Sequence, residues 1–481
     1  MVIQRSVEVI KKNQIFIGFL VITAASLFLF YPSLNYYFFQ DDWFVLNWVR
    51  TADWPSFFKF RTDIIYWRPL SMPLFFALNK LFFGLNPFGY HLVSFGIFFI
   101  LVFCIYQLFT LLIGDRKIAI IAPLLYAVWP IHFMSLSWLC TTSYIIGPLL
   151  QVMSFIFFIK YAQRKKNIFL IISFVIFILA LASSEFSLVL PLIMFGWGFL
   201  IQNKKYFKEI WPYFIIVVVY LIARWFVFPI PAKNQYQITI NHLIIDNLIW
   251  YFGWALNFPE SFKDLIDQRF PVQSVKILIQ FWRISLPTII LIALFIKLTI
   301  SLLKKNLRLL LMGLLWTIIG LLPVIALIGH SYSMYLSFAG LGVLYLISVA
   351  IKSANKIWMI LFIILWFLSS WANLQFTRNT HWLVNEQAIS RSYMGYVKKH
   401  IQNPSSESIF LFRPADLNFS RENNFILVET EDTLRQSLSD QEAIKVIYNE
   451  PTLKSIFATF KDNPKLPEGV PVIEIRPRIE K

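Results

Sequence analysis

The feature that most constrains this chain is a series of long apolar runs separated by short basic clusters. A helix that crosses a lipid bilayer needs about 20 mostly apolar residues. The pattern predicts an all-α polytopic membrane protein with eleven spans, near residues 14–31, 91–113, 118–132, 142–160, 168–183, 186–202, 210–230, 278–302, 309–328, 335–351 and 357–375.

The composition agrees with a membrane protein and excludes other classes. Apolar residues make up 58% of the chain and charged residues 14%, whereas soluble domains have about 45–50% and about 25%. The net charge of +17 lies wholly in residues 1–375, because residues 376–481 contain 14 basic and 14 acidic residues. These values exclude an ordinary cytosolic enzyme, a disordered chain and a nucleic-acid binder.

The basic clusters predict the orientation in the plasma membrane. Loops near 133–141, 184–185 and 329–334 contain no lysine or arginine. Because cytoplasmic loops are enriched in lysine and arginine, the amino terminus is predicted inside and the carboxyl terminus outside. The clusters assigned to the cytoplasm are Lys11/Lys12, Arg116/Lys117, Arg164/Lys165/Lys166, Lys204/Lys205/Lys208, Lys304/Lys305/Arg308 and Lys352/Lys356.

Segments outside these spans divide the chain further. The first run lacks a small-residue cleavage site and is interpreted as an uncleaved anchor, and 243–258 as an interfacial or re-entrant helix. Residues 1–375 form the predicted membrane domain, with 32–90 as a long first outer loop of short helices. Residues 376–481 are predicted to form a small outer α/β domain, with strands at 409–412, 425–428 and 472–475 and a helix at 432–447. Cys104 and Cys140 are interpreted as core residues, without a disulfide framework.

Two adjacent carboxylates, Asp41 and Asp42, follow the first span within an aromatic segment. An acidic pair in low dielectric perturbs its own titration, so the pair is a candidate for taking a proton or holding a cation. A helix cap or turn is the structural alternative. The sequence contains no cofactor motif, and a divalent cation on Asp41 and Asp42 is the one metal site that it suggests.

Two arginines are candidates for binding a lipid-linked phosphate at the outer surface. Arg68 lies beside Trp67, and Arg224 lies late in an otherwise apolar span. Guanidinium groups form forked, charge-assisted hydrogen bonds with phosphate oxygens. For Arg68 the alternative is packing on an aromatic ring, and for Arg224 it is a structural ion pair.

Further polar and aromatic groups at outer ends are candidates for contacting a sugar or an acceptor. Glu185 could orient a sugar hydroxyl or pair with an arginine, and a lone histidine is more often a hydrogen-bonded structural group than a ligand. Aromatic rings stack on sugar faces. The candidates are Glu185, His132, His330, Tyr66, Trp67 and Tyr332.

Six short elements occur in a fixed order along the chain: Asp41–Trp43, Tyr66–Leu70, Asn86–His91, Trp129–His132, Ser184–Glu185 with Leu190–Pro191, and Leu322–Val324. Together they resemble the GT-C superfamily of polytopic glycosyltransferases, in particular the dolichyl-phosphate-mannose protein mannosyltransferases and their bacterial relatives. The resemblance covers about residues 10–350, and the element similar to the family's K-E…L-P motif has Ser184 in place of the lysine.

The resemblance implies transfer of a sugar from a polyprenyl-phosphate donor outside the cytoplasm. It implies that Asp41, or less favourably Asp42, is the catalytic base in an inverting displacement, and the acceptor is a glycan, a lipid or a protein. Two other classes remain open. A transporter or flippase of lipid-linked intermediates predicts broken helices in paired repeats, and a non-catalytic envelope scaffold predicts a dispensable Asp pair.

Overall fold

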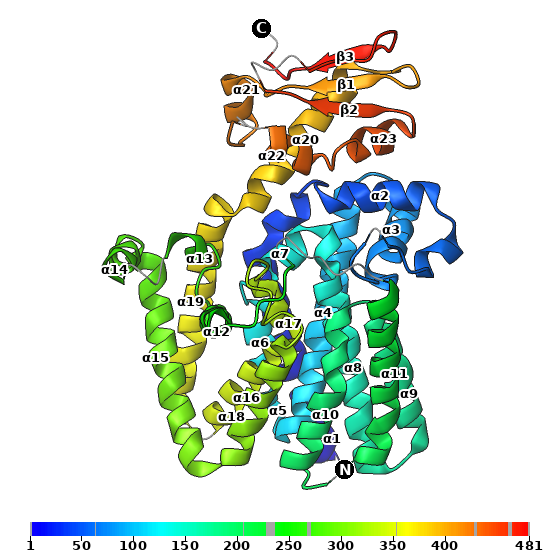
Figure 1. Cartoon of the computed structure of the whole chain (residues 1–481). Helices are drawn as coiled ribbons and strands as arrows, with labels where there is room; N and C mark the ends of the chain where they lie inside the picture. Colours follow the sequence, from blue (N-terminus) through cyan, green and yellow to red (C-terminus); the bar gives the residue numbers. More distant parts are fainter. Residues whose placement is uncertain are drawn as a thin grey trace.

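The computed structural model describes residues 2–62, 64–204, 206–227, 236–266, 271–352, 354–427, 431–459 and 464–479. Within these ranges the chain is mostly helical and includes one small three-stranded sheet. The long helices form a bundle, and the sheet lies beyond one end of it (Figure 1). The start of α1 (Val2–Phe30) and the sheet lie at opposite ends of the molecule.

Six helices among the described residues are long and apolar enough to cross a membrane, or seven if one bent pair counts as a single span. All of them coincide with predicted spans, and they support an integral membrane protein. They are α1 followed by η1 (Tyr31–Asn35), α4 (Pro87–Ile113), α8 (Ser143–Arg164), α11 (Phe207–Val227), α15 (Trp282–Lys305), α19 (Lys356–Thr380), and the bent pair of η6 (Ser333–Tyr335) with α17 (Leu336–Ala339) and α18 (Leu341–Lys352).

The predicted count of eleven spans is not confirmed, because the other four runs form shorter helices. The run 118–132 is broken, since α6 ends before Pro130 and proline cannot continue a helix. The helices in these four runs are α5 (Arg116–Ala119), α6 (Ile121–Ala127), α9 (Asn167–Leu181), η5 (Glu185–Val189), α10 (Leu190–Leu200) and α16 (Leu307–Leu321).

The bent pair turns by 60° at Gly340. A Cβ atom at this position would lie 2.5 Å from the ring of Trp129, so only glycine allows the close approach. The predicted non-spanning segment forms α12 (Leu243–Ala255), whose 13 residues are too few to cross a bilayer. Its level in the membrane stays a prediction. Two further helices, α13 (Phe262–Leu265) and α14 (Pro271–Gln280), lead to α15.

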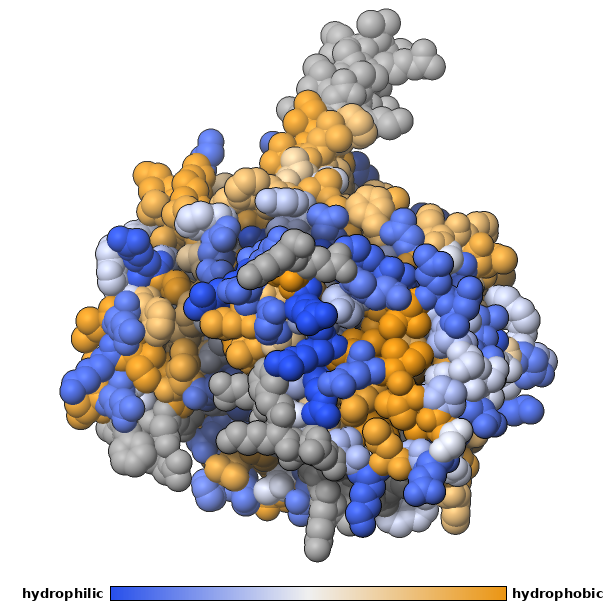
Figure 2. Space-filling model, turned by 90° about the horizontal axis from the view of Figure 1, so that it is seen from above, coloured by the Kyte–Doolittle hydropathy of each residue, from blue (hydrophilic) through white to orange (hydrophobic). Residues whose placement is uncertain are grey.

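The first outer loop contains short helices, as predicted: α2 (Asp41–Thr51), η2 (Trp54–Phe58), η3 (Leu70–Leu74) and α3 (Phe75–Phe83). Together with α7 (His132–Ser137) and η4 (Leu139–Thr142), α2 and α3 lie at the end of the bundle that faces the sheet (Figure 1). Figure 2 views the molecule from above, from the side on which the sheet lies, and shows hydrophilic side chains across the middle of the view, beside a patch of hydrophobic ones.

The carboxyl-terminal region is a parallel sheet with helices. Strands β1 (Ile409–Phe412), β2 (Lys454–Phe457) and β3 (Val472–Ile475) pair in the order β2-β1-β3, with Ile409 opposite both Lys454 and Val472. The associated helices are α20 (Trp382–His400), α21 (Leu417–Glu422), α22 (Glu431–Ser437) and α23 (Glu442–Tyr448).

The sequence predictions for this region are partly confirmed. Strands at 409–412 and 472–475 are present, whereas β2 was not predicted. The predicted strand at 425–428 is wrong at residues 425–427, which have no regular structure, and residue 428 lies outside the described residues. The predicted helix at 432–447 is two helices, because Ser439 and Asp440 have positive φ angles.

The first outer loop and the carboxyl-terminal region share one hydrophobic core. Phe38 and Trp43 of the loop are buried in the same cluster as Tyr393, Phe410 and Leu434. The cluster joins residues more than 300 positions apart. The carboxyl-terminal region is therefore packed onto the end of the bundle that carries α2. The predicted domain boundary at residue 375 falls inside α19.

Candidate active site

The two adjacent carboxylates at the start of α2 have different environments. Asp42 is buried, and it accepts hydrogen bonds from the backbone N–H groups of Cys140 (2.8 Å) and Phe39 (3.4 Å). Asp41 is partly exposed and makes no hydrogen bond to any residue that the structure describes. Consecutive helical side chains point about 100° apart, so the pair does not act as one unit. The carboxylate of Asp42 is committed to hydrogen bonds within the fold, whereas the carboxylate of Asp41 makes none with the described residues.

The turn before Asp41 is held by the carboxyl-terminal region. Gln40 has a φ of 47°, which is rare for a residue other than glycine. Its backbone N–H donates to the carbonyl of Ser437 (3.1 Å), and its side-chain amide donates to Glu386. A strained residue persists only where its surroundings fix it. These two contacts therefore fix the backbone at the start of α2, and with it the direction of the Asp41 side chain.

Further contacts fasten the rest of α2 to the same region. The indole N–H of Trp43 donates to the hydroxyl of Ser390 (2.9 Å), which itself donates to the carbonyl of Phe38 (2.6 Å). At the other end of the helix, Asn47 donates to Glu442 of α23. The helix that carries Asp41 is thus anchored along its length by α20 and α23.

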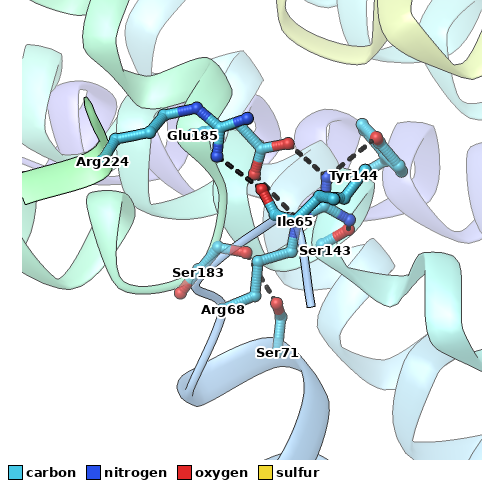
Figure 3. A network of polar contacts seen from close by, with 8 residues as sticks. All are labelled: Ile65, Arg68, Ser71, Ser143, Tyr144, Ser183, Glu185 and Arg224. Carbon is cyan, nitrogen blue, oxygen red and sulfur yellow. Dashed lines mark hydrogen bonds and ion pairs between the residues drawn. The ribbon is translucent and has the colours of Figure 1, made fainter. Parts of the chain in front are cut away.

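Arg68 is held on the other side of the site by a forked ion pair with Glu185 (Figure 3). Its Nε lies 2.8 Å and its Nη2 2.5 Å from the two carboxylate oxygens. The guanidinium also donates to the hydroxyls of Ser143 (3.1 Å) and Tyr144 (3.2 Å), and it lies 4.5 Å above the ring of Tyr66. Glu185 was predicted either to orient a sugar hydroxyl or to pair with an arginine, and the structure shows the ion pair with Arg68.

Arg224 approaches the same cluster from α11 (Figure 3). Its guanidinium donates to the backbone carbonyl of Ile65, and its charge acts on Glu185. Two guanidinium groups and one carboxylate therefore lie together. Guanidinium groups form charge-assisted hydrogen bonds with anionic groups.

Aromatic rings line the region next to this cluster. His330 lies 4.2 Å from the ring of Tyr236 and 4.8 Å from that of Tyr332, and Tyr335 packs against Tyr332 and Tyr144. The charges of Arg68 and Glu185 both act on His330, which places His330 near the ion pair. Flat rings beside fixed charges suit the face of a sugar.

Two predicted residues lie in different surroundings. His132 is fully buried in the bundle, 4.9 Å from the ring of Phe98 and 4.3 Å from that of Tyr126, so we correct it to a core residue. Trp67 donates from its indole N–H to the carbonyl of Phe58 (3.0 Å) and packs 5.2 Å from Phe60, which gives it a role in shaping the first outer loop.

The electrostatics of the acidic side follow from burial. Burial raises the pKa of Asp41 above its usual range, although the charge of Arg68 lowers it. Burial raises the pKa of Asp42 to about 8, against the lowering effect of its two backbone hydrogen bonds. Burial likewise raises the pKa of Glu386 to about 7, and the charge of Asp41 adds to this shift. Raised carboxyl pKa values near neutral pH are suited to proton transfer.

A metal site was suggested for Asp41 and Asp42. Among the residues that the structure describes, no group of three or more His, Cys, Asp or Glu side chains is placed to hold a metal ion. Asp42 directs both carboxylate oxygens to backbone N–H groups. The geometry of the two carboxylates therefore does not fit a cation bound between them.

Several residues of the site were not found from the sequence. Ser143, Tyr144 and Tyr335 lie in apolar or aromatic stretches where their types are common, and Tyr236 lies in a short polar segment without a motif, so nothing distinguished them. Glu386 had one signal, which is that it stands alone as an acid in the first turns after the last apolar run.

Comparison with protein-family models and with characterised proteins gave no match. Among solved structures, the chain is similar to the Archaeoglobus fulgidus oligosaccharyltransferase in complex with Zn and sulfate, with a TM-score of 0.46, 13% identity, and coverage of 90% of this chain and 61% of that chain. It is also similar to the oligosaccharyltransferase AglB of that organism in complex with an inhibitory peptide and a dolichol-phosphate, with a TM-score of 0.46, 12% identity, and coverage of 92% and 64%.

The chain spans less than two thirds of the length of both neighbours. A resemblance this distant transfers no residue roles, so the chemistry is derived from the geometry of this chain alone.

Proposed function

We propose that the protein is a membrane glycosyltransferase that moves a sugar from a polyprenyl-phosphate donor to a hydroxyl of an acceptor outside the cytoplasm. The observation that carries the proposal is the pairing of an available carboxylate with a fixed cationic cluster. Asp41 lacks a hydrogen-bond partner among the described residues, and it lies within the electrostatic reach of Arg68.

The proposed reaction is a single inverting displacement. Asp41 takes the proton of the acceptor hydroxyl as the hydroxyl oxygen bonds to the anomeric carbon. The bond from that carbon to the phosphate oxygen breaks on the opposite face, and its electron pair leaves with polyprenyl phosphate. A positioned general base accelerates such a step by about 10²- to 10⁴-fold, and the transition state has oxocarbenium character, as in glycoside hydrolysis.

The cationic cluster supports the leaving group in this proposal. Polyprenyl phosphate is a weak base and needs positive charge rather than an acid. Arg68 and Arg224 are proposed to provide that charge, because both guanidinium groups are held beside Glu185. Fixed charges of this kind are effective where water is excluded. The rings of Tyr66, His330 and Tyr332 are proposed to contact the sugar.

A direct assay tests the proposal. Purified protein in lipid nanodiscs is incubated with a panel of polyprenyl-phosphate sugars and a mixture of acceptor glycans, lipids and peptides. We expect release of polyprenyl phosphate with one donor, a product of inverted anomeric configuration, and loss of release in Asp41→Asn. Retained configuration, or a panel in which Asp41→Asn releases as much as the unmodified chain, would refute it.

A further inference from the structure

A second candidate site lies on the carboxyl-terminal region, away from the Arg68 cluster. It is a groove of about 390 Å³, which is large enough for a mono- or oligosaccharide unit. Residues of α20, of α21 and of the segment after β3 line it. They are Arg391, Ser392, Gly395, Tyr396, Lys399 and His400 from α20, Phe419, Glu422 and Asn423 around α21, and Arg478 and Ile479.

The groove is basic and has an aromatic wall. Arg391, Lys399 and Arg478 are exposed at its rim, and Glu422 is the one acid among the lining residues that the structure describes. The ring of Tyr396 stacks on His400 at 4.0 Å and meets Phe419 edge-on at 6.0 Å. Cations beside flat rings suit a sugar that carries a negative group.

Gly395 is an independent indication that the groove is kept open. Arg391, Gly395 and Lys399 follow one another at four-residue spacing and share one face of α20. A glycine inside a helix costs about 1 kcal/mol relative to alanine. Close packing does not require it here, because a Cβ atom would meet nothing within 4 Å. The missing side chain leaves bare backbone between two cations, where a ligand can approach.

We infer that this groove binds an anionic saccharide, with its carboxylate or phosphate between Arg391 and Lys399 and its ring against Tyr396. The identification of this saccharide as part of the acceptor rests on the proposed function, whereas the binding itself does not. Because α20 begins directly beyond α19, Arg391 is up to about 16 Å past the end of that helix at 1.5 Å per residue. This distance beyond the end of α19 favours a soluble glycan over a lipid headgroup as the ligand.

Calorimetric titration of the full chain in phosphatidylcholine nanodiscs tests the inference. The probes are trigalacturonate, mannose 6-phosphate and neutral maltotriose. We expect an anionic probe to bind at least tenfold more tightly than maltotriose, and more weakly at high salt. Equal binding of the neutral sugar, or no binding of either anionic probe, would overturn the inference.

Matched variants locate the binding. Arg391→Ala and Gly395→Leu are each expected to weaken the binding at least tenfold, whereas Lys398→Ala, which removes the same charge from a neighbouring residue outside the groove, leaves it unchanged. Gly395→Ala improves helix propensity and therefore controls for folding.

If phosphatidylglycerol nanodiscs abolish binding of the sugar probes, the groove binds headgroups and the inference fails. Failure here would leave the Asp41-dependent release of polyprenyl phosphate unaffected, so the two proposals fail separately.

Discussion

The basic and acidic sides of the candidate site are held in opposite ways. On the basic side, Arg68 is locked by direct side-chain bonds to Glu185, Ser143 and Tyr144. On the acidic side, the carboxylate of Asp41 makes no hydrogen bond within the described chain, whereas the backbone that carries it is held, at the turn before it by Glu386 and Ser437. The comparison teaches that the cation is fixed as a group, whereas the carboxylate is fixed through its backbone and remains free to accept a proton.

The largest effect is expected from removing Arg68. Arg68→Ala leaves Glu185 without its partner in a site of low exposure, where breaking such a pair costs about 3 kcal/mol or more. We expect a lower thermal midpoint in nanodiscs and no sugar transfer. Arg68→Ala/Glu185→Gln should regain most of the stability without regaining transfer. If the double variant transfers sugar, Arg68 serves only the fold.

Arg224 tests the basic side from a different helix, α11, and its guanidinium donates to the backbone carbonyl of Ile65. A charge-assisted hydrogen bond contributes about 1.5–3 kcal/mol. Arg224→Ala is therefore expected to raise the KM for the polyprenyl-phosphate donor by about 10- to 100-fold and to leave the acceptor KM unchanged. Arg224→Lys should recover part of the loss. An unchanged donor KM would contradict the phosphate role.

On the acidic side, Glu386 is expected to act as a positioning residue. Glu386→Ala removes the contact that holds Gln40, and we expect kcat to fall about tenfold with both KM values unchanged, within the range that misplacing a general base can cost. Glu386→Gln keeps an acceptor for Gln40 and should retain kcat. It also removes a negative charge near Asp41, so the acid limb of the pH–rate profile should move to lower pH.

Glu442→Ala is the matched control, because it breaks the contact of the same helix with Asn47 at the far end from Asp41. It should lower the thermal midpoint without moving the pH profile. A profile that shifts equally in the Glu386→Gln and Glu442→Ala variants would contradict the positioning role of Glu386.

The smallest effect concerns Asp42 and the pH dependence of stability. Folding raises the pKa of Asp42 from 3.8 to about 8, so the folded chain binds this proton more tightly than the unfolded chain. The contribution to the free energy of unfolding is therefore greatest below pH 4 and is lost as the pH rises toward 8. The side chain in the Asp42→Asn variant stays neutral at every pH. Between pH 5 and pH 9, the thermal midpoint of this variant should therefore fall by a few degrees less than that of the unmodified chain. If the thermal midpoints of the variant and the unmodified chain depend on pH in the same way, the raised pKa of Asp42 is contradicted.

The sequence was sufficient for the features that depend on local pattern. Long apolar runs predict the long helices because hydropathy is read residue by residue, and the short apolar run at residues 409–412 predicts β1. The runs near 118–132 and 309–328 form helices shorter than the runs themselves, so their predicted spans are not confirmed. Charge near the membrane identified Asp41, Arg68, Arg224 and Glu185, which the structure brings to one end of the bundle.

The pairings within the site could not be predicted. Arg68 and Glu185 are 117 positions apart, and Gln40 and Glu386 are 346 apart. No spacing rule connects residues that meet only through the packing of the whole chain. For the same reason the different environments of Asp41 and Asp42 were hidden, since Cys140 is far from both in sequence.

The central claim is that two neighbouring carboxylates have separate tasks, one chemical and one structural. Single-turnover release of polyprenyl phosphate by Asp41→Asn and Asp42→Asn, each with its thermal midpoint, tests this claim most directly. The account predicts that Asp41→Asn slows release at least 100-fold with an unchanged midpoint at pH 7, while Asp42→Asn retains release within tenfold. Rapid release by a folded Asp41→Asn, or a folded Asp42→Asn that is as inactive as Asp41→Asn, would contradict it.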